Sequence, residues 1–489
     1  MNEERYSALA AGLAAALPGF LPRQRWYGDK GQSIARVELA DAALLAEDAG
    51  SALLLAIASV RFTSTRRASY LLPLRLGADG AVELETALQD AAWQRACLDA
   101  SRENRRFAGR RGEFVFSASA RHGRWLAELT SGFRGRLSRA EQSNSSVIFA
   151  RAEGADLLLL KCFRRLAAGL NPDYEVTQFL GERTDFTSLP LLAGGIAYRP
   201  QGEGEPWTLA LWQQYIANHG DGWSYMVEAL ADGHESEALL AELGGLGQRT
   251  AELHAALASG TEPSFAPEPI AAADLQQWVA DLAQWIGHMA PELKRAADAM
   301  PAGGGATARQ ALARMASLPD MAAALAPLAG LAKIRIHGDY HLGQVLRTQA
   351  GDWAIFDFEG EPARPLAERR RKHSVLRDVA GMLRSLDYLA FAAGEARAVA
   401  GQAPLAAAWR GEARQAFWHG YREALGATAH SAALLPATGE EAERALGFFE
   451  IEKAVYEIAY ELHHRPDWLP IPLAGLERLL IAKQQQQRL

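Results

Sequence analysis

Apolar and polar residues follow two different patterns along the chain. After a short amphipathic helix at the start, apolar runs broken by Gly and Asp predict strands at residues 51–62, 68–76 and within 114–161. From Leu239 onward, apolar residues recur mainly with the period of an α-helix, among many Ala, Glu and Arg residues. This order predicts an α+β fold in which a strand-rich part precedes a mainly helical part.

Two segments interrupt the helical part. Residues 301–305 contain three consecutive glycines after a proline, which predicts a flexible connection. Residues 334–358 instead predict short apolar strands, and polar side chains are dense among them. We therefore expect the chemistry of the protein to involve the second segment.

Composition narrows the possible functions. The 489-residue chain is too long for one core, and its net charge of −7 disfavours broad binding to nucleic acids or anionic membranes. The basic run at residues 369–372 is interpreted as a solvated face. Its two cysteines, Cys97 and Cys162, offer neither a disulfide framework nor a cysteine metal cage. An acidic start without a long apolar run predicts a cytoplasmic protein.

The polar residues of the 334–358 segment suit phosphoryl transfer. That reaction needs a carboxylate that accepts the proton of a hydroxyl group, and oxygen ligands that hold Mg²⁺ against the phosphates. Asp339 fits the base, while Gln344 and Asp357 fit the ligands, because Mg²⁺ prefers carboxylate and amide oxygens. Glu359 shares a strand face with Asp357 and is a candidate ligand of a second Mg²⁺.

Each of these side chains, taken singly, also fits the polar end of a buried strand. The whole set is harder to explain in that way, and it favours catalysis. The two histidines of the segment, His337 and His341, are interpreted as scaffolding that hydrogen-bonds loop backbone and carboxylates.

The motif His337-Gly-Asp-x-His-x-x-Gln344 resembles the catalytic loop of the aminoglycoside-phosphotransferase and eukaryotic-like kinase superfamily, where Asn usually occupies the Gln position. The sequence Asp357-Phe-Glu is similar to the Asp-Phe-Gly of that superfamily. Longer stretches resemble bacterial maltokinases, which use ATP to phosphorylate maltose at its anomeric position. These stretches are residues 25–28, 220–223, 338–346, 357–365, 376–385 and 461–468.

The resemblance implies a two-lobed, protein-kinase-like fold. Residues 1–110 would form an N-terminal cap, residues 111–217 a nucleotide-binding lobe, and residues 218–489 a helical lobe for catalysis and acceptor binding. It also implies ATP and Mg²⁺ as cofactors, a sugar as substrate, and association with a trehalose synthase.

A lysine on the nucleotide phosphates is expected in such a fold. Lys161 is the single charge near the end of an apolar strand, and Asn171 and Pro172 then begin a helix that carries Glu175. We predict that Lys161 pairs with Glu175. The alternative is a lysine that extends to solvent and an ordinary glutamate in the first turn of a helix.

No glycine-rich loop precedes this strand. Ser143, Asn144 and Ser145 stand there instead, and their side chains and backbone N–H groups are suited to phosphate oxygens. Maltokinases have a similar loop, although taken alone the segment reads as a simple turn. Gln214 and Ile216, at the end of another predicted strand, are the candidate contacts for adenine.

The acceptor is expected at a helix predicted over residues 441–464. One face is apolar, and the other carries the carboxylates and aromatic rings that sugar sites combine. The candidate acceptor contacts are His341, Tyr456, Glu457, Tyr460, Glu461 and Arg465. The alternative is a solvated face joined by an ion pair between Lys453 and Glu457.

Two other functions stay open. A kinase of the same fold that acts on glucosamine or an aminoglycoside would need carboxylates for the amine, and four stand near the predicted site: Glu359, Glu361, Glu457 and Glu461. A pseudokinase that binds a partner enzyme is the second possibility.

Overall fold

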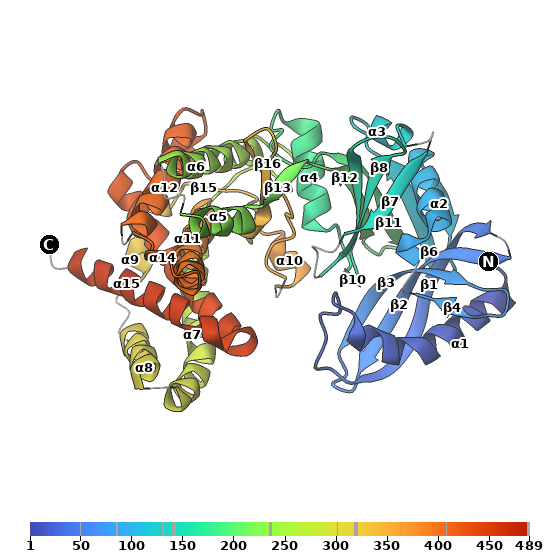
Figure 1. Cartoon of the computed structure of the whole chain (residues 1–489), viewed down its shortest axis with the longest axis horizontal. Coiled ribbons are helices and arrows are strands. Elements are labelled where there is room, and N and C mark those ends of the chain that lie inside the picture. Colours follow the sequence, from blue (N-terminus) through green and yellow to red (C-terminus); the bar gives the residue numbers. More distant parts are fainter. Residues whose placement is uncertain are drawn as a thin grey trace. The chain divides into compact units, whose positions relative to one another are not determined.

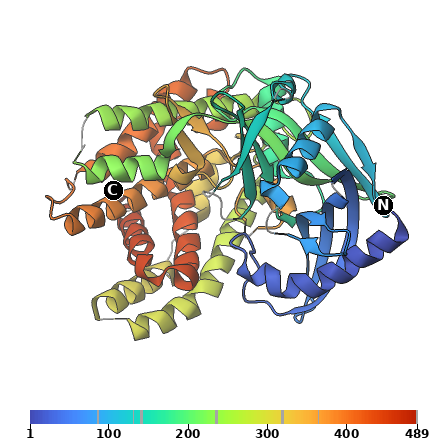
Figure 2. The same cartoon turned by 45° about the vertical axis from the view of Figure 1, so that its right-hand side comes forward.

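The computed structural model describes residues 1–48, 50–84, 87–129, 132–138, 143–233, 237–300, 302–316, 321–362, 364–406 and 408–486. The chain divides into two compact units, Met1–Ala217 and Asn218–Leu489. Figures 1 and 2 show the elements of each unit.

A small sheet covered by a helix begins the first unit. Helix α1 (Glu3–Phe20) buries Leu9, Leu13 and Leu17, which recur at helical spacing, in a core that also contains the β2 residues Leu54 and Ala56. The antiparallel sheet has the order β1-β2-β3-β10, and β4 pairs with β3. The strands are β1 (Ile34–Asp48), β2 (Ser51–Phe62), β3 (Arg67–Leu76), β4 (Val82–Glu83) and β10 (Arg165–Leu166).

The first unit also contains an antiparallel sheet with the order β5-β6-β11-β12-β9-β8-β7. Its strands are β5 (Arg106–Ala108), β6 (Gly112–Ala118), β7 (Phe133–Leu137), β8 (Ser145–Arg151), β9 (Asp156–Cys162), β11 (Leu192–Pro200) and β12 (Trp207–Gln214). Helix α2 (Ala91–Arg102) buries Trp93 and Cys97 in a core to which both sheets contribute. Both Cys97 and Cys162 are buried thiols. The unit also contains α3 (Arg124–Ala127), α4 (Pro172–Arg183), η1 (Leu21–Arg23) and η2 (Ala87–Gln89).

The second unit is mainly helical. Its helices are α5 (Gly222–Ala231), α6 (Glu237–Ala258), α7 (Ala272–Ala299), α8 (Ala302–Ala316), α9 (Met321–Leu325), α10 (Leu366–Arg369), α11 (Leu376–Val399), α12 (Trp409–Gly426), α13 (Ser431–Leu434), α14 (Gly439–His464) and α15 (Pro470–Gln486). The described residues of this unit also include the 3₁₀ turns η3 (Ala326–Leu328), η4 (Leu342–Gln344) and η5 (Pro466–Trp468). The short strands are β13 (Asn218–Asp221), β14 (Glu268–Pro269), β15 (Ala332–Lys333), β16 (Val345–Thr348) and β17 (Trp353–Ile355).

Glycines allow two of these helices to approach closely. A Cβ atom on Gly247 of α6 would lie 2.1 Å from the carbonyl oxygen of Phe417 in α12. A Cβ atom on Gly420 of α12 would lie 2.2 Å from the carbonyl oxygen of Gly244. Any larger residue at these positions would push α6 and α12 apart.

The predicted strands at residues 51–62 and 68–76 correspond to β2 and β3, and the predicted 441–464 helix corresponds to α14. The flexible connection predicted at residues 301–305 is wrong for residues 302–305, which begin α8, while Pro301 lies outside the described residues. Packing explains the glycine there, because a Cβ atom on Gly305 would lie 2.4 Å from the carbonyl oxygen of Ala297 in α7.

The predicted strand that carries Asp357 and Glu359 on one face is too long. Strand β17 ends at Ile355, and Asp357 adopts a left-handed conformation with φ of 66°. The alternation used to place Glu359 beside Asp357 therefore does not apply after Ile355.

Among the described helices, none is both long enough and apolar enough to cross a lipid bilayer.

Candidate active site

The backbone of the loop that carries Asp339 is held by a buried carboxylate. Asp378, in the first turn of α11, accepts hydrogen bonds from the backbone N–H groups of His337 (2.7 Å) and Gly338 (2.9 Å). The Nε2 atom of His254 lies 3.2 Å from the same carboxylate. Burial raises the pKa of Asp378, but the hydrogen bonds and the nearby imidazoles outweigh it and hold that pKa below its ordinary value. Asp378 thus fixes the position of the catalytic loop.

The loop also packs directly on two helices. A Cβ atom on Gly381 of α11 would lie 2.5 Å from the carbonyl oxygen of Tyr340, so only glycine permits this approach. The hydroxyl of Tyr340 lies 2.8 Å from the Oγ1 atom of Thr250 in α6. These contacts leave the neighbouring Asp339 on a rigid support.

The two histidines of the loop hydrogen-bond to backbone groups, which is the backbone part of their predicted role. The Nε2 atom of His337 lies 2.9 Å from the carbonyl oxygen of Phe356. The Nδ1 atom of His341 accepts a hydrogen bond from the N–H of Gly343 (3.0 Å). Burial lowers the pKa of His341, so this imidazole is neutral at pH 7. His337 and His341 therefore shape the loop.

The carboxylate of Asp339 contacts a cation from the C-terminal helix α14. The Nζ atom of Lys453 donates to Asp339 (3.2 Å) and to Glu361 (3.0 Å). Burial lowers the pKa of Lys453, but the two carboxylates outweigh that effect and raise its pKa above the ordinary value. Lys453 is therefore charged, and it orients the candidate base.

Glu361 is the centre of an ion cluster behind Lys453. Its carboxylate lies 2.5 Å from Nε of Arg364 and 3.8 Å from Nη2 of Arg377. Burial raises the pKa of Glu361, but Lys453, Arg377 and Arg364 lower it far more, so Glu361 stays ionised. We call these four residues the Glu361 cluster. Within it, Glu361 links Lys453 to the two arginines.

The predicted metal ligands lie at one end of the β16–β17 hairpin. Val345 pairs with Ile355, and the N–H of Phe356 donates to the carbonyl oxygen of Gln344 (3.1 Å). Gln344 directly precedes β16, and Asp357 lies two residues after the end of β17. Both therefore lie at the same end of this strand pair. A non-glycine residue with positive φ, such as Asp357, is uncommon and is often found at functional sites.

This donor set suits Mg²⁺. Gln344 offers an amide oxygen, and Asp357 and Glu359 offer carboxylates on one tight turn, in which the N–H of Glu359 donates to the carbonyl oxygen of Asp357 (2.8 Å). All three are hard oxygen ligands. The roles of Gln344, Asp357 and Glu359 as ligands stay predictions.

The polar side of α14 is not a solvated face, so that alternative is wrong. Glu461 is only 1% exposed, and its carboxylate accepts from the hydroxyl of Tyr388 (3.2 Å) and from Arg465 (2.7 Å). Glu457 accepts from the buried Arg384 (2.7 Å). Lys453 pairs with Asp339 and Glu361, whereas the alternative paired it with Glu457.

Aromatic rings gather beside the C-terminal end of α14. The ring of Trp468 stacks on Tyr388, with centroids 6.1 Å apart, and lies 6.2 Å from Trp223 and 6.5 Å from Phe391. We call these four residues the aromatic platform. The guanidinium of Arg465 lies 4.9 Å from the ring of Trp468. Such rings bind the C–H faces of sugars, so the platform is a candidate acceptor surface.

The two other aromatic acceptor candidates, Tyr456 and Tyr460, lie on α14 itself. Tyr460 is 41% exposed and stacks on His464, with centroids 4.4 Å apart. Tyr456 lies nearer to Lys453, whose Nζ is 4.7 Å from its ring centroid. Contact of these tyrosines with a sugar stays a prediction.

In the first unit, Lys161 forms a buried ion pair with Asp173 (2.8 Å). Asn171 caps α4, as predicted, by accepting from the N–H of Asp173 (2.8 Å), and Pro172 is the first helical residue. Asp173 thus reaches the lysine from the first turn of the helix. The predicted pairing of Lys161 with Glu175, which is also buried, stays a prediction.

The remaining predicted nucleotide contacts lie at strand ends. Ser145 begins β8, and its hydroxyl accepts from Nε of the buried Arg164 (2.8 Å). The adjacent Asn144 and Ser143 lie just after residues 139–142, which are outside the described part. Gln214 ends β12 and donates its backbone N–H to Leu191 (2.9 Å), and Ile216 follows in the last residues of the first unit.

Three residues gained roles that the sequence did not reveal. Asp378 lies in a stretch that resembles maltokinases but carries no motif of its own, and Asp173 stands two residues before Glu175, the predicted partner of Lys161. Lys453 enters the sequence analysis only through the alternative ion pair with Glu457. Contacts over long sequence separations decide these roles, so periodicity could not show them.

Comparisons with known proteins place this geometry among sugar kinases. Residues 20–101 match the family model described as the maltokinase N-terminal cap domain. The chain is 31% identical over 360 residues to a glucosamine kinase of Streptacidiphilus jiangxiensis, covering 72% of this chain and 75% of that protein. It is 27% identical over 360 residues to a glucosamine kinase of Mycolicibacterium smegmatis, covering 73% and 82%.

A solved structure shares almost the whole fold. It is a glucosamine kinase in complex with glucosamine, ADP and inorganic phosphate, with a TM-score of 0.67 and 25% identity over 96% of this chain and 99% of that chain. This similarity confirms the predicted α+β, kinase-like fold with an N-terminal cap and a mainly helical C-terminal part.

Proposed function

The chain belongs to the maltokinase-like sugar kinases of the aminoglycoside-phosphotransferase superfamily, and from this premise we propose that it transfers the γ-phosphate of ATP to maltose. One observation carries the choice of acceptor. Helix α14 contacts the candidate base at one point and the aromatic platform at another. The distance between these two points is long enough for two sugar rings.

The separation follows from helix geometry. Lys453 contacts Asp339, while Glu461, two turns further along α14, contacts Tyr388 of the platform. At about 1.5 Å per residue, these two points of the helix are about 12 Å apart. A single ring bound at Asp339 is too short to reach the platform, whereas a disaccharide spans this length. Maltose would therefore place its reducing ring at Asp339 and its second ring on Trp468.

Asp339 acts as the base in the proposed reaction. It accepts the proton of the anomeric hydroxyl while the hydroxyl oxygen forms a bond to the γ-phosphorus and the bond to ADP breaks. Lys453 holds the Asp339 carboxylate in place, and Asp378 holds the loop. Gln344 and Asp357, with Glu359, would hold Mg²⁺, which neutralises phosphate charge when bound.

The first unit would hold the nucleotide. Lys161 is fixed by Asp173 near the end of β9, and a lysine in this role binds the phosphates of ATP. Ser143, Asn144 and Ser145 would contribute hydroxyl, amide and N–H donors to the phosphates, and Gln214 and Ile216 would contact adenine.

Glucosamine is the second candidate acceptor, because the relatives reported above are glucosamine kinases. An amine needs a carboxylate, yet the carboxylates predicted for that purpose have cationic partners. Glu361 contacts Lys453, Glu457 contacts Arg384, and Glu461 contacts Arg465. The carboxylate of Glu359 lies 3.9 Å from Arg369. These pairs favour a neutral acceptor.

A panel of acceptors tests the proposal. Purified full-length protein is assayed with ATP, Mg²⁺ and either maltose, glucose, glucosamine or kanamycin, with coupled detection of ADP. We expect kcat/KM to be at least tenfold higher for maltose than for the others. A preference for glucosamine would replace maltose as the acceptor, and ATP binding without turnover on any acceptor would indicate a pseudokinase.

A further inference from the structure

A second cavity in the Asn218–Leu489 unit borders the catalytic loop but is distinct from the small cavity lined by Asp339, Lys453 and Tyr456. It has a volume of about 740 Å³ and lies between α7 and residues 360–377. Small-molecule sites commonly have volumes of about 300–1,000 Å³. Gly338 and residues of the Glu361 cluster line both cavities, so the two share a wall.

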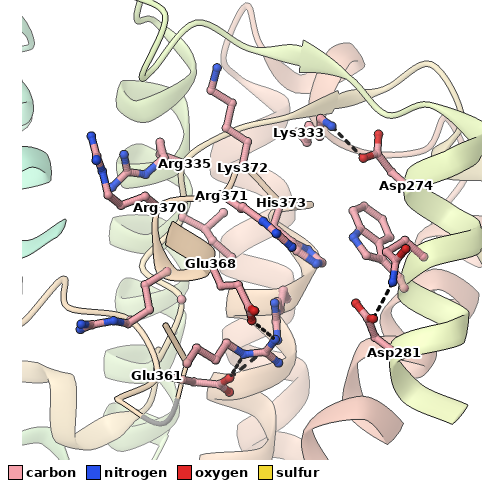
Figure 3. A pocket seen from close by; sticks show the side chains of 18 of the residues that line it. Asp274, Asp281, Lys333, Arg335, Glu361, Glu368, Arg370, Arg371, Lys372 and His373 are labelled. Atoms are coloured by element: carbon pink, nitrogen blue, oxygen red, sulfur yellow. Dashed lines mark hydrogen bonds and ion pairs between the residues drawn. The ribbon is translucent and has the colours of Figure 1, made fainter. Parts of the chain in front are cut away.

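One wall of this cavity is basic. Among the described lining residues, eight are Arg or Lys and six are Asp or Glu, in a chain whose net charge is −7. Arg369, Arg370, Arg371 and Lys372, the run predicted as a solvated face, all line this cavity. Figure 3 shows Arg370, Arg371 and Lys372 on the side opposite the α7 residues Asp274 and Asp281.

Most of the acidic lining residues are already neutralised by cations. Glu268 contacts Lys372 (2.6 Å), and Asp274 contacts Lys333 (2.8 Å). Glu452 contacts Arg377 (3.2 Å). These cations belong to the same lining, so eight basic residues against six acidic ones leave an excess of two positive charges, which suits a negatively charged ligand.

The opposite wall has the chemistry of a sugar site. Seven residues at helical spacing along one face of α7 line the cavity: Asp274, Gln277, Trp278, Asp281, Gln284, Trp285 and His288. Carboxylates and amides bind hydroxyl groups, and the two indole rings offer apolar faces. Asp281 already accepts from Gln277 (2.8 Å), which orients its carboxylate toward the same face.

A neutral histidine lies between the two walls. The ring of His373 stacks on Trp278, with centroids 4.3 Å apart, and its Nδ1 atom accepts from the N–H of Ser374 (3.0 Å). The proton of the neutral ring must then be on Nε2. His373 lines the cavity, so this N–H is a donor for an uncharged hydroxyl or for an anion.

We propose that this cavity binds a sugar phosphate, with its phosphate monoester on the wall formed by Arg370 and Arg371. The polyol is bound by Asp281 and Gln284 and covers the edge of Trp278. The ligand is a phosphorylated hexose, and Asp339 is not among the residues that line this cavity. Guanidinium groups bind phosphate through paired hydrogen bonds, which explains why arginine predominates in the run.

Isothermal titration calorimetry of the full-length protein without ATP tests this site with glucose 6-phosphate, inorganic phosphate and glucose. We expect one molecule of glucose 6-phosphate to bind per chain, inorganic phosphate to bind at least tenfold more weakly, and glucose to give no measurable binding. Equal affinities for glucose and glucose 6-phosphate, or no binding of glucose 6-phosphate, would overturn the proposal.

Variants locate the ligand. The double variant Arg370→Glu/Arg371→Glu should weaken glucose 6-phosphate binding at least tenfold. Arg295→Glu reverses the charge of an exposed α7 residue that does not line the cavity. The affinity of this variant for glucose 6-phosphate should match that of the wild type. Asp281→Ala should weaken the affinity for glucose 6-phosphate but not for inorganic phosphate, and it leaves the basic wall intact.

A final variant distinguishes binding in this cavity from binding in the catalytic cavity. Asp339→Asn should bind glucose 6-phosphate as the wild type does. Loss of binding in Asp339→Asn, or unchanged binding in Arg370→Glu/Arg371→Glu, would place the ligand in the catalytic cavity and overturn the proposal. The assay contains no ATP and no acceptor, so its outcome does not depend on the proposed kinase activity.

Discussion

The ammonium group of Lys453 lies 3.2 Å from the carboxylate of Asp339, although the two residues are 114 positions apart in the sequence. Glu361 contacts the same ammonium group at 3.0 Å and is held by two arginines. The C-terminal helix α14 therefore forms part of the catalytic site. Its position is coupled to that of the base through one lysine.

Replacement of Asp339 by Asn should remove the base but keep the shape of the side chain. We expect kcat to fall about 10²- to 10⁴-fold, the usual contribution of a general base. The KM for ATP should change little, because Asp339 is not among the predicted nucleotide contacts. Steady-state assays with varied ATP and maltose measure both constants, and activity within threefold of wild type would contradict the assignment.

Replacement of Lys453 by Met should release the Asp339 carboxylate from its cationic partner. Glu361 would keep Arg364 and Arg377, so we expect the fold to survive and kcat to fall at least tenfold. Lys453→Arg keeps the charge and should recover part of the loss. Equal kcat values for the Met variant and the wild type would show that the contact does not orient the base.

Replacement of Asp378 by Asn should destabilise the protein as well as lower kcat. A charged acceptor of buried hydrogen bonds contributes about 1.5–3 kcal/mol, so we expect a loss of that size at pH 7. The folded-state pKa of Asp378 is held below the ordinary 3.8. Its stabilising contribution is therefore present above about pH 4 and is lost as the pH falls through the folded-state pKa.

Denaturant unfolding at several pH values checks this prediction. The difference in unfolding free energy between wild type and Asp378→Asn should be constant from pH 6 to 7 and shrink as the pH falls below about 4. A difference that grows toward acid would mean that the ionised carboxylate is not the stabilising form.

Much of the fold was predictable because its signals are local. Strands β2 and β3 are continuous apolar runs bounded by turn residues, and Asn171-Pro172 marks the start of α4. The candidate base, ligands and phosphate lysine stand in short motifs, so the sequence was enough to name them.

Other features depend on contacts between distant segments. The glycines of residues 303–305 read as flexible, but Gly305 allows α8 to pack on α7. Glu457 and Glu461, predicted as acceptor contacts, hydrogen-bond instead to Arg384 and Tyr388 of α11, which lie about 73 residues earlier in the chain. The basic run lines a cavity only because α7, about 90 residues earlier, lies opposite it.

Replacement of Trp468 by Ala should remove the centre of the aromatic platform. We expect the KM for maltose to rise at least tenfold with kcat changed less than threefold, because a contact to the second ring binds ground state and transition state alike. Glucose, which cannot reach the platform from Asp339, should show no change and serves as the internal control. A similar rise in KM for both sugars would place the first ring on Trp468.

Lys161 has two acidic candidates for its partner, Asp173 and Glu175, and both lie in the first turn of α4. The ion pair with Asp173 is short and buried, so Asp173→Asn should raise the KM for ATP at least tenfold and lower stability. Glu175→Gln is the matched control, since it neutralises the neighbouring acid on the same turn. We expect a smaller change in the KM for ATP from that variant.

Double-mutant cycles with Lys161→Met resolve the partner directly. Residues in direct contact usually show coupling free energies of about 0.5–3 kcal/mol, whereas independent sites add within about 0.5 kcal/mol. We therefore expect the coupling of Lys161 with Asp173, measured by denaturant unfolding, to exceed its coupling with Glu175. The reverse order would assign the lysine to Glu175, as the sequence first predicted, and would make Asp173 available for another role at the phosphates.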